Sequence, residues 1–276
     1  MTLQKLRPEH IQSAYKVMLD SGLSARTVLH SHRVLSQALK DAVKWGLILH
    51  NPAAAVTPPR PERKEAVAWD SATIKKFMDA AGGSRYRDAF RLAALTGMRR
   101  SELAGLKWPD IDLKSARLRV VRTRQRIYGH GIVEGQPKTH RSRRSVALSP
   151  SAVSVLKSVN TNQIEMRLKA GPAWHQTDYV FTKDSGAPID PDNLSHEFRR
   201  IVNEADLPRG TFHGLRHSFA TALLATNVHP AVVQSALGHS SITLTIDTYS
   251  HVMPGLEEAA ARSIDDVLGD AVAGNS

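Results

Sequence analysis

Five side chains have the types that metal-independent phosphoryl transfer requires. They are Arg99, His213, Arg216, His239 and Tyr249. His213 and Arg216 are three residues apart, so on a helix they share one face and can address the same phosphate. A phosphodiester that is exchanged without a metal needs a nucleophile, cations that hold the charge of the transition state, and an acid for the leaving oxygen. This set offers the nucleophile and the cations.

Tyr249 is the candidate nucleophile. A phenol with a pKa of about 10 attacks poorly at neutral pH. It therefore needs adjacent cations and a proton acceptor, which Arg99, Arg216 and His213 could provide. The alternative is a tyrosine that packs its ring and exposes its hydroxyl. The other tyrosines lack such a context, and they are Tyr15, Tyr86, Tyr128 and Tyr179.

Arg99 follows Thr96 and Gly97, which end an apolar helical pattern. The guanidinium can therefore project from a loop or from a new helix start, and its fixed fork suits two phosphate oxygens. Neighbouring Arg100 is an equally cationic competitor, and an arginine here could also be an ordinary surface residue. From these residues alone the choice stays open.

The histidines each have a second interpretation. His213 and His217 are four residues apart and could hold zinc, but the glutamate of a His-Glu-x-x-His hydrolase site is absent. A zinc site is therefore not favoured. His239 follows Gly238 where the pattern predicts a helix C-terminus, and a cationic imidazole is favoured there for structural reasons alone. No acidic cluster of the kind that binds Mg²⁺ stands out, which argues against a two-metal nuclease.

Lys138 adds a flexible ammonium near a predicted turn, where it could protonate the leaving oxygen or contact a DNA phosphate. The formal charge of +11 favours a polyanionic partner, although ribosomal, membrane-surface and merely basic proteins share such a charge. Its concentration around Lys138 favours DNA, and we expect Arg141, Arg143 and Arg144 to bind it. Between residues 113 and 150 the sequence has one acidic residue, Glu134, and many basic ones. The basic residues are Lys114, Arg117, Arg119, Arg122, Arg124, Arg126, Lys138, Arg141, Arg143 and Arg144.

The apolar periodicity predicts the elements that must position these residues. Residues 118–121 and 146–148 are typical of antiparallel strands. Ser24 is a candidate helix N-cap, as is Asp70 or Ser71. The expected fold is mainly α with a small antiparallel β-sheet. Helices are expected at 8–19, 24–46, 71–77, 87–95, 151–168 and 191–206, and from 213 onward.

The composition fits a globular protein of one large or two ordinary domains, with 276 residues of which 41% are hydrophobic. There is no cysteine for a disulfide or a thiolate metal site, no apolar run long enough to span a membrane, and no signal-peptide core at the N-terminus. We therefore expect a cytoplasmic protein. The proline- and charge-rich stretch 57–65 cannot continue a helix and predicts an interdomain linker.

Several motifs together resemble the tyrosine recombinase (phage integrase) family over most of the chain. The resemblance implies a site-specific DNA recombinase or integrase that cuts and rejoins strands through a 3′-phosphotyrosyl intermediate, with no metal and no cofactor. The motifs are Thr96-Gly97-Met98-Arg99, Lys138-Thr139 with Ser142 and Arg144, the box from His213 to His217, Leu237-Gly238-His239, and Tyr249.

The resemblance also implies roles and partners. Tyr249 matches the nucleophile, and Glu102 matches the position that orients the first arginine. The implied partners are double-stranded DNA attachment sites, a homotetramer in the synaptic complex, and excision or host DNA-bending factors. The residues that match the family's catalytic positions around the phosphate are Arg99, Lys138, His213, Arg216 and His239.

The domain organisation expected from the resemblance is a clamp around duplex DNA. Residues 1–56 form a partial helical core-binding (SAM-like) domain, 57–66 a linker, 67–264 the catalytic domain and 265–276 a C-terminal tail. An apolar stripe near the C-terminus could dock on a neighbouring protomer or pack in cis, and it consists of Leu256, Ala260, Ile264, Val267 and Leu268.

The N-terminal region is shorter than the family's core-binding domains usually are, and many integrases carry an arm-site domain before it. We therefore expect a fragment, a mis-assigned start or a compact variant. Two other functions stay open on the residues alone. One is a type IB topoisomerase, which shares the nucleophile and the cations, and the other is an inactive DNA-binding fragment of an integrase.

Overall fold

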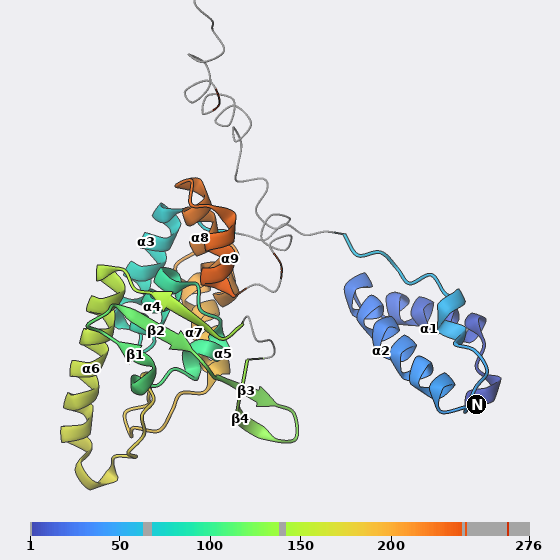
Figure 1. Ribbon diagram of the computed structural model, residues 1–276, viewed down its shortest axis with the longest axis horizontal. Coiled ribbons are helices and arrows are strands. Elements are labelled where there is room, and N and C mark those ends of the chain that lie inside the picture. Colours follow the sequence, from blue (N-terminus) through green and yellow to red (C-terminus); the bar gives the residue numbers. More distant parts are fainter. Residues whose placement is uncertain (1, 63–67, 138–141, 239–240, 242–263, 265–276) are drawn as a thin grey trace, which may run out of the picture. The chain divides into compact units, whose positions relative to one another are not determined.

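The computed structural model describes residues 2–62, 68–137, 142–238, 241 and 264 (Figure 1). The chain divides into two compact units, Met1–Glu65 and Ala66–Ser276. Within the described ranges, no helix combines the length and the apolar character needed to cross a membrane.

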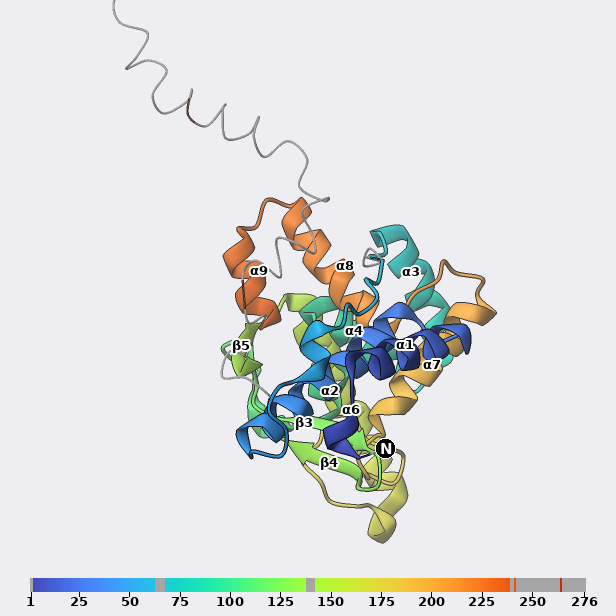
Figure 2. The same cartoon turned by 90° about the vertical axis from the view of Figure 1, so that its right-hand side faces the viewer.

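The first unit is built on two α-helices that lie against each other (Figure 1, Figure 2). The Ser24 hydroxyl begins the second helix by accepting a hydrogen bond from the backbone N–H of Thr27 at 3.2 Å, as the sequence predicts. Ile11, Tyr15 and Val28 are buried between the helices. The elements of this unit are η1 (Leu3–Lys5), α1 (Pro8–Asp20), α2 (Ala25–Lys44) and η2 (Pro52–Ala55).

The second unit is mainly helical, as the sequence predicts. Its helix α3 is capped by Asp70, whose carboxylate accepts from the N–H of Thr73 at 2.7 Å. Its α-helices are α3 (Ser71–Ala80), α4 (Arg87–Thr96), α5 (Arg100–Ala104), α6 (Pro150–Ala170), α7 (Pro191–Glu204), α8 (Phe212–Ala225) and α9 (Pro230–Leu237). In the described part of this unit, short 3₁₀ segments lie between the larger elements at η3 (Ala81–Gly83), η4 (Trp108–Asp110) and η6 (Gly171–Ala173).

The described part of the second unit also contains two small antiparallel sheets. The first has the order β1-β2-β5, with β1 (Ile111–Asp112), β2 (Arg117–Val120) and β5 (Arg144–Ala147). In its register Leu118 lies opposite Val146, and Val120 opposite Arg144. The second sheet is a hairpin of β3 (Thr123–Ile127) and β4 (Gly131–Gly135), in a glycine-containing stretch for which the sequence predicts no strand of its own.

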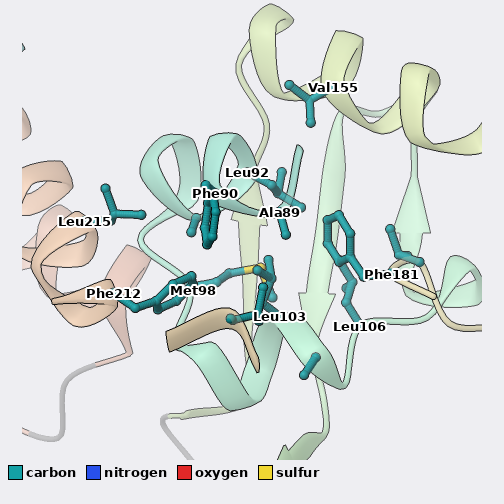
Figure 3. Packing of buried hydrophobic residues seen from close by; sticks show 14 of the residues in the cluster. Ala89, Phe90, Leu92, Met98, Leu103, Leu106, Val155, Phe181, Phe212 and Leu215 are labelled. Atoms are coloured by element: carbon teal, nitrogen blue, oxygen red, sulfur yellow. The ribbon is translucent and has the colours of Figure 1, made fainter. Parts of the chain in front are cut away.

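Helix α4 runs through the centre of this unit and packs against α6 and α8. Phe90 on α4 is fully buried, and Figure 3 shows it near Met98 and Phe212, side chains from the α4–α5 turn and the start of α8. An aromatic cluster extends this core, since Phe77 and Phe198 have ring centroids 4.5 Å apart. The core therefore fixes the starts of α5 and α8 relative to each other, and these are the helices that carry the candidate site.

Candidate active site

A glycine turn places Arg99. Helix α4 ends at Gly97, whose φ of +62° is in the left-handed region that glycine adopts without strain. A Cβ atom at this position would lie 2.6 Å from Phe219 Cδ1 and 2.9 Å from Leu237 Cδ2. Both the conformation and the close approach of α8 and α9 thus require glycine here.

Arg99 is the N-cap residue of α5, and Glu102 holds it at two points. The Arg99 backbone N–H donates to Glu102 Oε2 at 2.9 Å, and Arg99 Nη1 donates to Glu102 Oε1 at 2.7 Å. The side chain of Arg99 remains 33% exposed. The guanidinium is therefore fixed on one side and open to solvent on the other, which suits a group that must meet a ligand.

Glu102 is buried, with only 2% of its surface exposed, and it also binds Arg144. Arg144 Nη2 donates to Oε2 at 2.9 Å and Nη1 to Oε1 at 3.1 Å, so the pair is bidentate. Burial alone would raise the pKa of the Glu102 carboxyl. The hydrogen bond and charge of Arg144, followed by the charge of Arg99, more than offset this and lower the pKa to about 2. Glu102 is thus an anion that binds both Arg99 and Arg144.

The sequence predicts a DNA contact for Arg144, and the structure places this residue differently. Its side chain is 5% exposed. Its Nε donates to the carbonyl of Ala236 at 2.6 Å, and Nη1 also lies 3.3 Å from the carbonyl of Ser142. The guanidinium therefore faces the protein interior. Arg143 beside it is exposed and donates to the side chain of Gln136.

Arg216 on α8 is buried, with 2% of its surface exposed. Its Nη1 donates to the carbonyl of Gly97 at 2.8 Å, and its Nη2 donates to the carbonyl of Leu237 at 2.6 Å. Arg216 thereby ties the turn before Arg99 to the end of α9. Because a guanidinium carries five N–H donors in a fixed fork, these two bonds also set the plane in which the group lies.

His213 lies in the first turn of α8, after the N-cap Thr211, whose hydroxyl accepts from the N–H of Gly214 at 3.2 Å. Part of the His213 residue faces solvent. Desolvation of its imidazole, followed by the charges of His217, Arg216 and Arg99, lowers its pKa to about 4. His213 is therefore neutral at neutral pH. His217 meets it edge to face, with ring centroids 4.9 Å apart, and burial lowers the pKa of His217 as well.

A cavity of about 490 Å³ opens beside these groups. Arg99 and His213 line it together, and Arg100 does so as well. Arg100 Nη1 donates to Ser195 Oγ at 2.9 Å and lies 3.0 Å from Asp192 Oδ1. Both partners lie near the start of α7. Arg99 is paired with the carboxylate of Glu102 in its own helix, α5, whereas Arg100 links α5 to α7. The remaining lining residues are Ser101, Arg124, Gln125, Ser195, Phe198, Arg199, Gly210, Thr211 and Phe212.

The structure therefore brings together part of the set predicted from the sequence. Arg99 and His213 share one cavity, and Arg216 binds the turn that carries Arg99. Four of the predicted site residues lie outside the described ranges, and these are Lys138, Arg141, His239 and Tyr249. The buried link from Glu102 through Arg144 to Ala236 was not predicted from the sequence.

Comparison with known proteins identifies the family. A model of the phage integrase family matches residues 69–255. A tyrosine recombinase XerC-like protein of Caldanaerobacter subterraneus subsp. tengcongensis is 33% identical, over 97% of this chain and 73% of the relative. The ICEBs1 integrase of Bacillus subtilis is 27% identical, over 96% of this chain and 72% of the relative.

Solved structures show the same fold. A Tn1549 transposon integrase in complex with a circular intermediate DNA superposes with a TM-score of 0.79, at 22% identity, over 95% of this chain and 86% of that one. A lambda integrase tetramer bound to a Holliday junction gives a TM-score of 0.64 at 23% identity, over 89% of this chain and 65% of that one. On the family match and the 33% identity across nearly its whole length, the chain belongs to the phage integrase family and is a tyrosine-type site-specific recombinase.

Proposed function

We propose that this recombinase cuts and rejoins DNA through a 3′-phosphotyrosyl link formed by Tyr249, without a metal ion and without a cofactor. The observation that carries the proposal is the anchored guanidinium of Arg99, which the buried Glu102 carboxylate holds at the edge of a cavity shared with His213. Such a pre-positioned cation stabilises the charge of a phosphoryl-transfer transition state without moving during the reaction.

In the cleavage step the Tyr249 oxygen attacks the scissile phosphorus, and the bond from phosphorus to the 5′-oxygen breaks. The tyrosine proton passes to a base and the leaving oxygen takes a proton from an acid, for which Lys138 is the candidate. Arg99 meets the phosphate with the open side of its guanidinium, Arg216 contributes positive charge from its buried position behind the Gly97 turn, and His239 donates a further hydrogen bond. Rejoining runs the same step backwards with a different 5′-hydroxyl, so no energy source is consumed.

His213 is suited to the proton transfer from Tyr249. A neutral imidazole has a lone pair that can accept a proton, and His213 is neutral at neutral pH; its depressed pKa of about 4 makes it a weaker base than a free histidine and a readier donor once protonated. Its place beside Arg99 in the cavity puts it next to the proposed phosphate position. His217, packed against its ring, would hold its orientation.

DNA binding is proposed for both units. In the first, residues 1–56 would form a core-binding domain, and the exposed face of α2 offers Arg26, Arg33 and Lys40 at seven-residue spacing, on one side of the helix. In the second, Arg141 and Arg143 would contact phosphates near the strand β5, within a catalytic domain that we place at residues 67–264. The linker at 57–66 would join the two units.

We propose a homotetramer as the active assembly on duplex attachment sites, supported by the similarity to an integrase that was solved as a tetramer on a Holliday junction. Ile264, from the apolar stripe near the C-terminus, is 62% exposed and could dock on a neighbouring protomer. Excision or host DNA-bending factors would add to this assembly. The cytoplasm, as expected from the sequence, is the proposed compartment.

The test is covalent trapping on a library of nicked duplexes with a randomised centre. A nick next to the cleavage position lets the short 5′-ended strand diffuse away, so each phosphotyrosyl adduct accumulates and its DNA can be sequenced. We expect the wild type to give adducts with a shared core sequence and Tyr249→Phe to give none. Tyr128→Phe is the matched control, because its fully exposed ring at the β3–β4 hairpin should leave the yield unchanged. Equal adduct from Tyr249→Phe would overturn the nucleophile assignment.

A further inference from the structure

The C-terminal end of α9 is held by two buried guanidinium groups. The last carbonyls of an α-helix have no partner within the helix and need one from outside. Here the carbonyl of Ala236 accepts from Arg144 Nε at 2.6 Å, and the carbonyl of Leu237 accepts from Arg216 Nη2 at 2.6 Å. The chain continues from this point to Gly238, His239 and the proposed nucleophile Tyr249.

Arg144 connects that helix end to the base of Arg99. Its Nε points to α9, while its two Nη groups point to the two oxygens of Glu102, which in turn holds Arg99. Strand β5 supplies the rigid base, because Arg144 pairs with Val120 in the sheet. All three guanidinium nitrogens donate to acceptors within the protein. Because the side chain is also only 5% exposed, a DNA phosphate has little access to it.

We propose that Arg144 is a positioning residue, which aligns Arg99 through Glu102 and fixes the end of α9 from which the chain leads to Tyr249. This inference rests on the proposed function of Arg99 and Tyr249. It replaces the DNA contact that the sequence predicts for Arg144 by an indirect role in the chemical step.

Only arginine can make this connection. The guanidinium binds a carboxylate with two parallel N–H groups while its Nε addresses a third acceptor in another direction. A lysine has one nitrogen and would keep either the contact with Glu102 or the contact with Ala236. We therefore expect Arg144→Lys to fold and to bind DNA, yet to cleave it slowly. A misplacement of catalytic groups by about 1 Å can cost about 100-fold in rate, which sets the expected scale.

The experiment compares Arg144→Lys and Arg144→Met with Arg143→Met, at the exposed neighbour for which we propose a phosphate contact, so that its loss should lower the affinity and leave the rate at saturation unchanged. Single-turnover adduct formation is measured at saturating DNA, and affinity is measured by fluorescence anisotropy across a salt series. The proposal predicts rates about 100-fold lower for the Arg144 variants, with affinity and salt dependence close to wild type. If Arg144 contacts DNA instead, its loss lowers the affinity and reduces the salt slope by about one, and the rate at saturation stays normal.

The pH dependence of DNA cleavage distinguishes a positioning role from a merely structural one, because loss of a merely structural residue would not change the pH profile. The cations that act on Glu102 are Arg144 from β5 and Arg99 on its own helix, and the titratable His213 from α8 also interacts with it. Without Arg144, only Arg99 remains to offset the burial that raises the pKa of Glu102. The carboxyl then takes a proton as the pH falls, and it no longer binds Arg99 as an anion. Arg144→Met should therefore lose cleavage toward pH 5 while the wild type does not, and adding Glu102→Gln should remove the difference in pH profile.

The outcomes separate the inference from the proposed function. No adduct from the wild type on any duplex overturns the proposed function and this inference with it. A wild-type adduct combined with normal saturating rates in both Arg144 variants overturns the inference alone. If Arg144→Met does not fold, Arg144→Lys and Glu102→Gln carry the test, since Glu102→Gln keeps the side-chain shape and should slow cleavage without weakening DNA binding.

Discussion

Substituting Gly97 by alanine should destabilise the second unit more than the same change at any open glycine. The added Cβ meets two penalties. A left-handed φ of +62° costs a residue with a Cβ about 1 kcal/mol. The Cβ would also lie 2.6 Å from Phe219 and 2.9 Å from Leu237, and forcing such contacts apart in a packed core costs about 1–3 kcal/mol. The sum is about 2–4 kcal/mol.

The assay is thermal and urea unfolding of the second unit, with Gly129→Ala as the matched control. Gly129 has a φ of +76° in the β3–β4 turn, and nothing lies within 4 Å of an added Cβ, so only the backbone penalty applies there. We expect Gly97→Ala to lower the Tm by about 5–15 °C and Gly129→Ala by less than half of that. The Phe219→Leu background should reduce the penalty of Gly97→Ala, because the shorter side chain leaves room for part of the clash.

The same substitution should slow DNA cleavage. The carbonyl of Gly97 accepts from Arg216 and its turn leads into Arg99, so a displaced turn moves both cations. Equal destabilisation of Gly97→Ala and Gly129→Ala, with normal cleavage by both, would refute the reasoning that the close packing of this turn builds the site.

Three other predictions concern Arg216, Glu102 and His213. Arg216→Lys should bind DNA nearly as well as the wild type and cleave it about 100-fold more slowly in single-turnover assays, because the charge remains while the fork is lost; a parallel loss of affinity would contradict this. Because the pKa of Glu102 is lower in the folded state than its unfolded-state value of about 4.5, the ionised carboxyl adds about 3 kcal/mol to the free energy of unfolding above that pH. This contribution should disappear as the pH falls toward 2, and urea unfolding of Glu102→Gln should lack this acid-dependent step. NMR titration of the His213 ring should have its midpoint near 4, because desolvation and then the nearby cations disfavour protonation; a midpoint at the ordinary histidine value of about 6.5 would contradict this lowering of the pKa.

The helices were predictable because their signals are local. Ser24 and Asp70 cap α2 and α3 through hydrogen bonds to residues three positions on, and Gly97 ends α4 in the left-handed conformation that the Thr96-Gly97 pair suggests. The β3–β4 hairpin was not predicted. Its strands contain glycines and charged residues in place of apolar alternation, and distant groups hold it, such as the carboxylate of Asp190 that binds Arg126.

The candidate site was predictable in its residue types more than in its contacts. Arg99 and Arg100 look alike in sequence, and the separation of their roles comes from α7, whose Asp192 and Ser195 hold Arg100 from more than ninety positions away. Arg144 was interpreted as a DNA contact because it stands beside Arg141 and Arg143 in a basic run. A signal for its burial was present, since Arg144 and Val146 are two residues apart on a strand and share the face that turns inward.

The central claim is that Tyr249 forms the bond to DNA, and peptide mapping of the trapped adduct tests it most directly. The chain has no lysine or arginine between Arg216 and Arg262, so trypsin releases residues 217–262 as one peptide that contains Tyr249 and no other tyrosine. After nuclease trimming, tandem mass spectrometry should locate the remaining nucleotide on Tyr249 in this peptide. A nucleotide on any other residue, or an adduct whose peptide 217–262 is unmodified, would contradict the account.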